Sequence, residues 1–255
     1  LTILLGGIRR IADISTVLVP VMALLYLGGG LAVILGNLRR LPEALILMLR
    51  CAVAPEAALG GALGIVTRRE ALRWGVARSV FSNEAGLGSA SITAACADTD
   101  EPVKQGLISM TGVFFDTMVI CTVTGLAICC SGTLGAADGN GLPLTGAALT
   151  LRAFETVLGP LAPWLIGAAL GLFAFTSVLG CAVQAETTAS YLLGPEAVRP
   201  CRVLYGLAVF VGAVIPMATV LQLADLANAL MAFSNLVCLL LLSGEIAGEC
   251  GRKER

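Results

Sequence analysis

The feature that most constrains this chain is a set of long, uncharged apolar runs. Residues 16–35 contain no charged side chain, and about 20 such residues in a helix span the hydrocarbon core of a bilayer. Further apolar stretches cover residues 105–131, 161–193 and 203–247. Charged residues make up only 13% of the chain, roughly half their share in a soluble domain. The sequence therefore predicts an all-α integral membrane protein embedded in a lipid bilayer.

Charge and side-chain chemistry argue against several functional classes. The formal net charge is −1, so there is no basic excess to hold phosphate backbones, and we expect no nucleic-acid partner. The chain has no His, which removes the commonest metal ligand and proton carrier. Its nine Cys are scattered without a CxxC pair and are interpreted as small buried hydrophobes. We expect no bound cofactor and no enzymatic activity.

Hydropathy predicts one transmembrane domain over residues 1–255, in a multi-pass protein of the cell (plasma) membrane. The expected spans are 14–36, 70–97, 105–131, 161–193, 203–220 and 224–247, of which the second is broken. The many charges between residues 37 and 70 leave the topology of that stretch open. Asp225, at the start of the last span, is interpreted as a helix N-cap.

The segment 78–90 is the most informative part of the sequence. It places Asn83 and Glu84 beside Gly86 and Gly88 within an apolar stretch, and each glycine disfavours continuous helix by about 1 kcal/mol relative to Ala. Unwound backbone in a transporter offers carbonyls to cations and N–H groups to carboxylates. Close helix packing would explain the glycines but not the amide and the carboxylate. The segment therefore predicts a functional break in a helix.

Two other positions carry polar groups inside apolar spans. Asp116 lies near the centre of the span 105–131, where a carboxylate must face the bundle interior or a partner; a structural hydrogen-bond hub is the alternative. Thr176 and Ser177 place adjacent hydroxyls in the span 161–193. Hydroxyl oxygens suit a hard cation such as Na⁺, although such groups also commonly bond back to their own helix.

The sequence resembles the alanine/glycine:cation symporter family. The resemblance rests on residues 75–90, on 102–107 and on 115–117, with weaker matches over nearly the whole chain. It implies a leucine-transporter-like fold of two inverted repeats, of which this chain would cover the end of the first and all of the second. The missing N-terminal half of the same protein, with the first broken helix, would then be a partner. The implied function is cation-coupled symport, with sodium as the expected coupling ion, of small neutral amino acids such as alanine or glycine across the cytoplasmic membrane.

The resemblance also implies roles for individual residues. The substrate-binding set is Asn83, Glu84, Gly86, Gly88 and Cys181; the sodium ligands are Thr176 and Ser177; Asp116 and Gln105 are structural or coupling residues. Cys181 stands where the family usually carries a tryptophan, which predicts a roomier substrate pocket.

Two alternatives from other classes remain. A membrane-embedded enzyme could use Glu84 and Asp116 as an acid and base pair, and an ion channel would carry a filter that is symmetric between subunits. Recovery of the amino acid unchanged would argue against the enzyme, and saturable, stereoselective uptake would argue against the channel. The sequence does not distinguish sodium from proton coupling, or one amino acid from another.

Overall fold

The computed structural model describes residues 7–53, 68–99, 101–139 and 141–252, and these residues are mostly helical, with no strand among them. Within these described ranges, five helical stretches are long and apolar enough to cross a membrane: Ile14–Gly36, Pro102–Ser131, Gly146–Leu193, Pro195–Val214 and Met217–Gly248. The all-helical class expected from the sequence is confirmed. The leucine-transporter-like arrangement of the helices stays a prediction. Residues 54–67, within the stretch whose topology was left open, lie outside the described residues.

The described residues divide into two compact units. The first takes its residues from 1–13, 77–114 and 177–255, and the second from 14–76 and 115–176. Helices α1, α4 and α9 and the helix through Phe114 each contribute to both units. The helices are α1 (Gly7–Gly36), α2 (Leu41–Val53), α4 (Arg68–Asn83), α5 (Ser89–Ala94), α6 (Pro102–Val113), α7 (Thr122–Ser131), α8 (Gly146–Leu158), α9 (Ala162–Leu193), α10 (Val198–Val214) and α11 (Met217–Arg252). A π-helical segment, Phe114–Cys121, joins α6 to α7.

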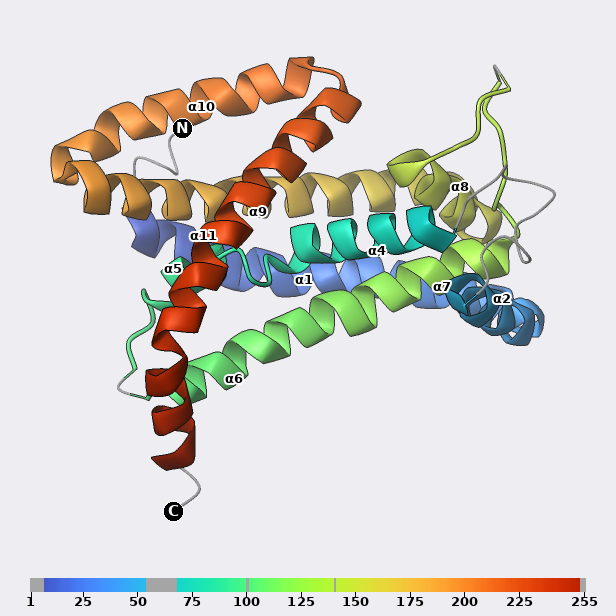
Figure 1. The fold of residues 1–255 in the computed structure, drawn as a ribbon. Helices are drawn as coiled ribbons and strands as arrows, with labels where there is room; N and C mark the ends of the chain where they lie inside the picture. Colours follow the sequence, from blue (N-terminus) through green and yellow to red (C-terminus); the bar gives the residue numbers. More distant parts are fainter. Residues whose placement is uncertain (1–6, 54–67, 100, 140, 253–255) are drawn as a thin grey trace. The chain divides into compact units, whose positions relative to one another are not determined.

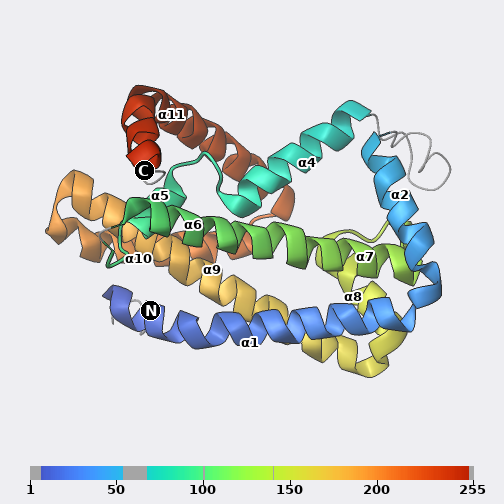
Figure 2. The same cartoon turned by 90° about the horizontal axis from the view of Figure 1, so that it is seen from below.

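The core of the second unit forms where α1, α7, α8 and the first half of α9 meet (Figure 2). Phe154 on α8 is 0% exposed. Its ring centroid lies 5.7 Å from that of Tyr26 on α1, which also makes an edge-on contact with Phe173 at 5.9 Å. The Tyr26 hydroxyl is 2.8 Å from the Thr124 hydroxyl on α7. The short amphipathic helix α8 therefore seals the core through one large aromatic side chain.

In the first unit, α10 returns antiparallel along the second half of α9 (Figure 1). The Tyr205 hydroxyl donates to the carbonyl of Val178 at 2.9 Å, while Arg202 binds Glu186. Pro216 separates α10 from α11, and Ile215 before it is extended, with φ −73° and ψ 145°. The residue before a proline disfavours the helical region, so the chain turns at this point into the next span.

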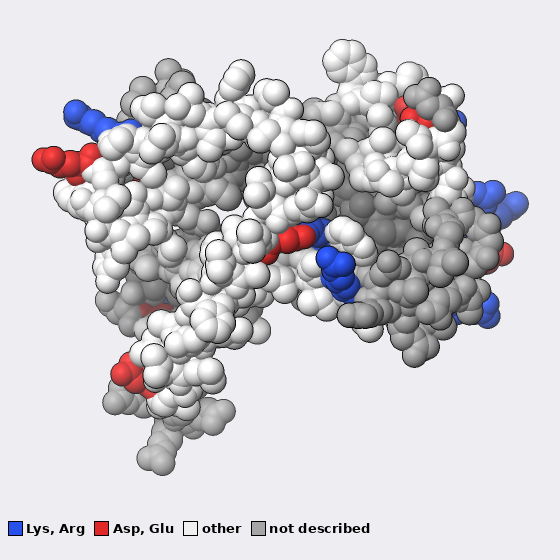
Figure 3. Space-filling model, turned by 45° about the horizontal axis from the view of Figure 1, so that its top comes forward, with Lys and Arg blue, Asp and Glu red and all other residues white. Residues whose placement is uncertain are grey.

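The surface is mainly apolar. Leu240 and Leu241 on α11 are 75% and 81% exposed, and Figure 3 shows a mostly white face on which the coloured charged residues are few and lie in small groups. A surface of this kind is stable in hydrocarbon rather than in water.

Gly30 on α1 allows a close approach between helices in the second unit. A Cβ built on Gly30 would lie 2.5 Å from Cγ1 of Val123 on α7, whereas one on Gly28 has nothing within 4 Å. Membrane helices commonly pack through such small residues. Val cannot yield easily, because its χ1 is restricted in a helix.

We therefore expect Gly30→Ala to destabilise the protein by about 1–3 kcal/mol through overpacking, and Gly28→Ala to be tolerated. Thermal unfolding of the purified protein in detergent measures both. Val123→Ala combined with Gly30→Ala should recover most of the loss. If Gly30→Ala and Gly28→Ala unfold at the same midpoint temperature, α1 and α7 do not approach closely at Gly30.

Candidate functional site at a broken helix

The helix break predicted near Asn83 is a short turn between α4, which ends at Asn83, and α5, which begins at Ser89. The carbonyl of Glu84 accepts a hydrogen bond from the N–H of Leu87 at 3.1 Å. Gly86, the third residue of this four-residue turn, has φ 77°, and Gly88 has φ 85°. A positive φ at the third position is what a type II turn requires, and glycine adopts it without strain. The two glycines therefore break the helix for a conformational reason.

Side chains of α5, α9 and α11 bind two polar groups of the break, the Gly86 carbonyl and the Glu84 carboxylate. Asn235 Nδ2 on α11 donates to the carbonyl oxygen of Gly86 at 3.0 Å. Glu84 Oε2 accepts from Ser89 Oγ at 2.5 Å and from Gln184 Nε2 on α9 at 3.1 Å. Irregular backbone at membrane depth is tolerated only where such partners replace the helical hydrogen bonds.

The end of α4 is fixed to α11 by an ion pair between Arg78 and Asp225. The Arg78 guanidinium also lies over the ring of Phe81, with Cζ 5.1 Å from the centroid. The interpretation of Asp225 as an N-cap is wrong, because α11 begins at Met217 and Asp225 lies two turns inside it. Sequence reasoning missed this pair, although a charge in an apolar span usually has a partner of opposite sign.

The break forms one wall of an open pocket of about 510 Å³ in the first unit, with α6 and α11 as the other walls. Four of the predicted substrate residues line it, namely Asn83, Glu84, Gly86 and Gly88. The other walls are mainly apolar and include Met110, Phe114 and Leu239, with Ser109 and Asn235 as their polar members. A few polar groups facing an apolar wall, in a volume of this order, suit a small ligand with one polar end.

The other predicted residues lie away from the pocket walls. Cys181 is exposed on α9 and is not among the described residues that line the pocket; it lies one turn before Gln184, on the same face of the helix. Gln105 is half-buried on α6, next to the lining residue Gly106. Asp116 is half-buried in the π-helical segment, a kind of distortion often found at functional sites. Their roles stay predictions.

The Thr176 hydroxyl bonds back to its own helix. Its Oγ1 lies 3.0 Å from the carbonyl oxygen of Leu172 and 3.1 Å from that of Phe173, and 3.7 Å from Sδ of Met22. Donating the hydroxyl proton leaves the oxygen lone pairs available to a cation. Ser177 is exposed. The back-bonded geometry of Thr176 is therefore compatible with a sodium ligand, and the sodium role of Thr176 and Ser177 stays a prediction.

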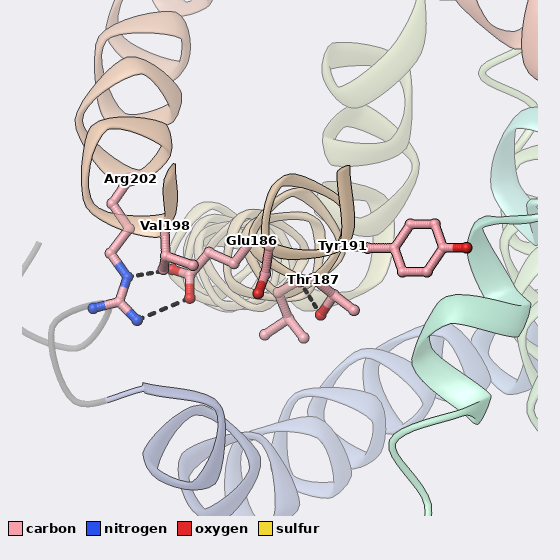
Figure 4. A pocket seen from close by; sticks show the side chains of 7 residues that line it. Glu186, Thr187, Tyr191, Val198 and Arg202 are labelled. Carbon is pink, nitrogen blue, oxygen red and sulfur yellow. Dashed lines mark hydrogen bonds and ion pairs between the residues drawn. The ribbon is translucent and has the colours of Figure 1, made fainter. Parts of the chain in front are cut away.

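A second pocket of about 510 Å³ lies between α9 and α10 (Figure 4). Arg202 binds Glu186 through two parallel bonds, Nε to Oε1 at 2.6 Å and Nη2 to Oε2 at 2.9 Å. Both side chains are largely buried, and Tyr191 points to the opposite side of α9 from Arg202. Sequence reasoning had not joined these two residues. The paired geometry satisfies both charges.

Comparison with known proteins identifies the family. The sequence profile of the sodium:alanine symporter family matches residues 1–252. The chain belongs to this family. An uncharacterized transporter of Haemophilus influenzae is 44% identical over 239 residues, covering 93% of this chain and 51% of that protein.

Two further relatives carry more specific names. The sodium/alanine symporter AgcS of Methanococcus maripaludis is 40% identical over 247 residues, which cover 97% of this chain and 53% of the relative. The probable sodium/glutamine symporter GlnT of Bacillus subtilis is 39% identical over 244 residues, covering 95% and 49%. The chain spans about half the length of the curated relatives it matches. Together with the five apolar helices, membership of this transporter family makes the chain part of a multi-pass membrane protein.

Gly86 offers a test of the break itself. Gly86→Ala places a side chain at φ 77°, which is strained even though nothing lies within 4 Å of the added Cβ; we expect a loss of about 1–2 kcal/mol of stability. Gly112→Ala on α6 also meets nothing within 4 Å, in ordinary helical backbone, and should be neutral or stabilise by up to about 1 kcal/mol.

Thermal unfolding in detergent compares the stability of the Gly86→Ala and Gly112→Ala proteins. If Gly86→Ala unfolds at or above the midpoint of Gly112→Ala, residues 84–88 do not need the left-handed backbone seen in the structure.

Proposed function

We propose that this chain forms part of a cation-coupled amino-acid symporter of the cell membrane, in which the broken helix supplies part of the substrate site. The observation that carries the proposal is the pocket of about 510 Å³ beside Asn83, Gly86 and Gly88, in a chain that belongs to a symporter family. The turn frees backbone groups that a continuous helix would occupy, and such groups can bind a zwitterion's carboxylate or a cation. Asn83 adds a side-chain amide at the same wall.

The proposed cargo is a small neutral amino acid, and the proposed coupling ion is sodium. Two relatives carry names with sodium in common but different amino acids, alanine and glutamine. A third, from Bacillus subtilis, is named a putative sodium/proton-dependent alanine carrier. The experiment must therefore vary both the amino acid and the ion. We also propose the leucine-transporter-like arrangement, with alternating access around a site at the midplane of the bilayer.

Transport in proteoliposomes tests the proposal. The protein is expressed from the complete reading frame that encodes these residues, and uptake of labelled L-alanine is measured with an inward gradient of sodium, of protons, or of neither. We expect saturable uptake of L-alanine that needs the sodium gradient. Unlabelled L-glutamine and glycine are added as competitors, and the strength of their inhibition ranks the amino acids by preference. Absence of uptake of each of these amino acids under both gradients would contradict symport.

The same assay distinguishes the two alternatives. Chromatography of the vesicle contents should recover alanine unchanged, whereas a membrane-embedded enzyme using Glu84 and Asp116 would convert it. D-Alanine should compete poorly. Uptake that neither saturates nor distinguishes the two enantiomers would favour a channel.

The hydroxyl pair on α9 yields a prediction about sodium. Thr176→Val keeps the shape of the side chain but removes its oxygen, and Ser177→Ala removes the neighbouring one. If these oxygens bind the ion, each loss should raise the half-saturating sodium concentration roughly tenfold or more, since contacts to a charged group are worth about 1.5–3 kcal/mol.

Thr111→Val on α6 is the matched control, because Thr111 also bonds back to its helix, with Oγ1 2.9 Å from the carbonyl of Leu107. Its sodium dependence should stay at the wild-type value. If Thr176→Val and Ser177→Ala behave like this control, the pair only bonds to its own helix.

A further inference from the structure

Gln184 on α9 contacts both sides of the helix break. Its Nε2 donates to Glu84 Oε2 at 3.1 Å, just beyond the end of α4, and to Thr93 Oγ1 on α5 at 3.3 Å. A glutamine amide nitrogen carries two N–H donors, so one nitrogen can make both bonds. A single side chain of a neighbouring helix thus joins the two halves of the broken helix.

The chemistry of the partners calls for a hydrogen-bond donor at this position, which the amide supplies. An ionised carboxylate such as Glu84 only accepts hydrogen bonds, so the nitrogen end of Gln184 must face it. Leu would supply no donor at position 184. Glu would set two carboxylates against each other, which disfavours the charged form of both.

The backbone of Glu84 gives an independent reason for such a link. Its φ is 52°, in the left-handed region that a residue with a long side chain rarely adopts. Strained backbone of this kind persists where the surroundings hold it in place. Ser89 and Gln184 hold the carboxylate from the same oxygen, Oε2.

Gln184 is not among the described residues that line the pocket, whereas Glu84 is. Gln184 therefore contacts a residue of the pocket wall without lining the pocket itself. We propose that Gln184 is a positioning residue, which holds α4 and α5 through Glu84 and Thr93 in the geometry that forms the substrate pocket. In this proposal the Glu84 carboxylate forms the link, and its negative charge is not needed to bind the transported amino acid. The inference rests on the proposed function for the identity of the cargo.

An exchange of the two side chains tests the proposal in the complete transporter. The single variants Gln184→Leu, Gln184→Glu and Glu84→Gln each remove part of the link. The double variant Glu84→Gln with Gln184→Glu restores an amide facing a carboxylate, with the charge moved from α4 to α9. L-Alanine and sodium are the probes, and half-saturating concentrations and maximal rate are measured separately.

We expect Gln184→Leu and Gln184→Glu to raise the half-saturating L-alanine concentration roughly tenfold or more, the loss expected for hydrogen bonds to a charged group. The double variant should return to within a few-fold of wild type. Gln222→Leu, at an exposed position on α11, is the matched control and should leave uptake unchanged. Two results would overturn the proposal. The first is wild-type kinetics for Gln184→Leu. The second is a double variant whose half-saturating L-alanine concentration rises by the product of the two single-variant increases, which would show that the Glu84 charge binds the cargo itself.

Thermal unfolding of wild type, Glu84→Gln, Gln184→Glu and the double variant tests the contact without any uptake. The changes in midpoint caused by Glu84→Gln and Gln184→Glu should be non-additive. The double variant should unfold at a higher temperature than the sum of the two single losses predicts. If wild type takes up no amino acid but the midpoints are non-additive, the proposed function fails and the contact stands. If wild type transports and the midpoints are additive, the link from α9 is refuted while the function is not.

Discussion

Backbone hydrogen bonding in an apolar environment is the constraint on which the rest of this structure depends. An unpaired N–H or C=O group costs several kcal/mol in hydrocarbon, so the chain is helical wherever it is described, apart from short connections. A helix can be broken only where other groups take over the lost bonds. At Gly86 that partner is the amide of Asn235, contributed by α11. The polar residues around the break are therefore a structural requirement before they are anything else.

Ionisable side chains obey the same constraint. Arg78 pairs with Asp225 and Arg202 with Glu186, each time between two helices of the first unit. The Arg202–Glu186 pair is the more buried of the two, and removing one partner of a buried pair leaves an uncompensated charge, which is far costlier than the pair is favourable. The Arg202–Glu186 pair joins α10 to α9, and the Arg78–Asp225 pair joins α4 to α11. The second of these contacts holds the end of α4, and with it the break, beside α11, where the pocket lies.

The sequence was sufficient to predict the elements that depend on local chemistry. Apolar runs predicted the helices, and two glycines beside Asn83 and Glu84 predicted the position of the break. The pairing of residues distant in sequence could not be predicted in this way. Gln184 follows Glu84 by a hundred positions, and nothing in its local sequence indicates which of its neighbours on α9 faces the break. The N-cap expected at Asp225 failed for a related reason: hydropathy fixed the start of the last helix too late, so an internal ion pair was taken for a helix end.

Hydroxyl groups show why geometry alone does not decide function at such a site. Thr176 bonds back to α9, as do Thr187 and Thr188 further along the same helix. Each of these hydroxyls uses its proton and keeps its lone pairs, so the protein-only contacts of a cation ligand and of an inert hydroxyl are the same. What distinguishes them is whether a second group with free oxygens stands close enough to complete a shell. In this chain Ser177 is adjacent in sequence, and the rest of a shell, which takes about six or more oxygens for a hard cation such as Ca²⁺, must come from groups in other segments.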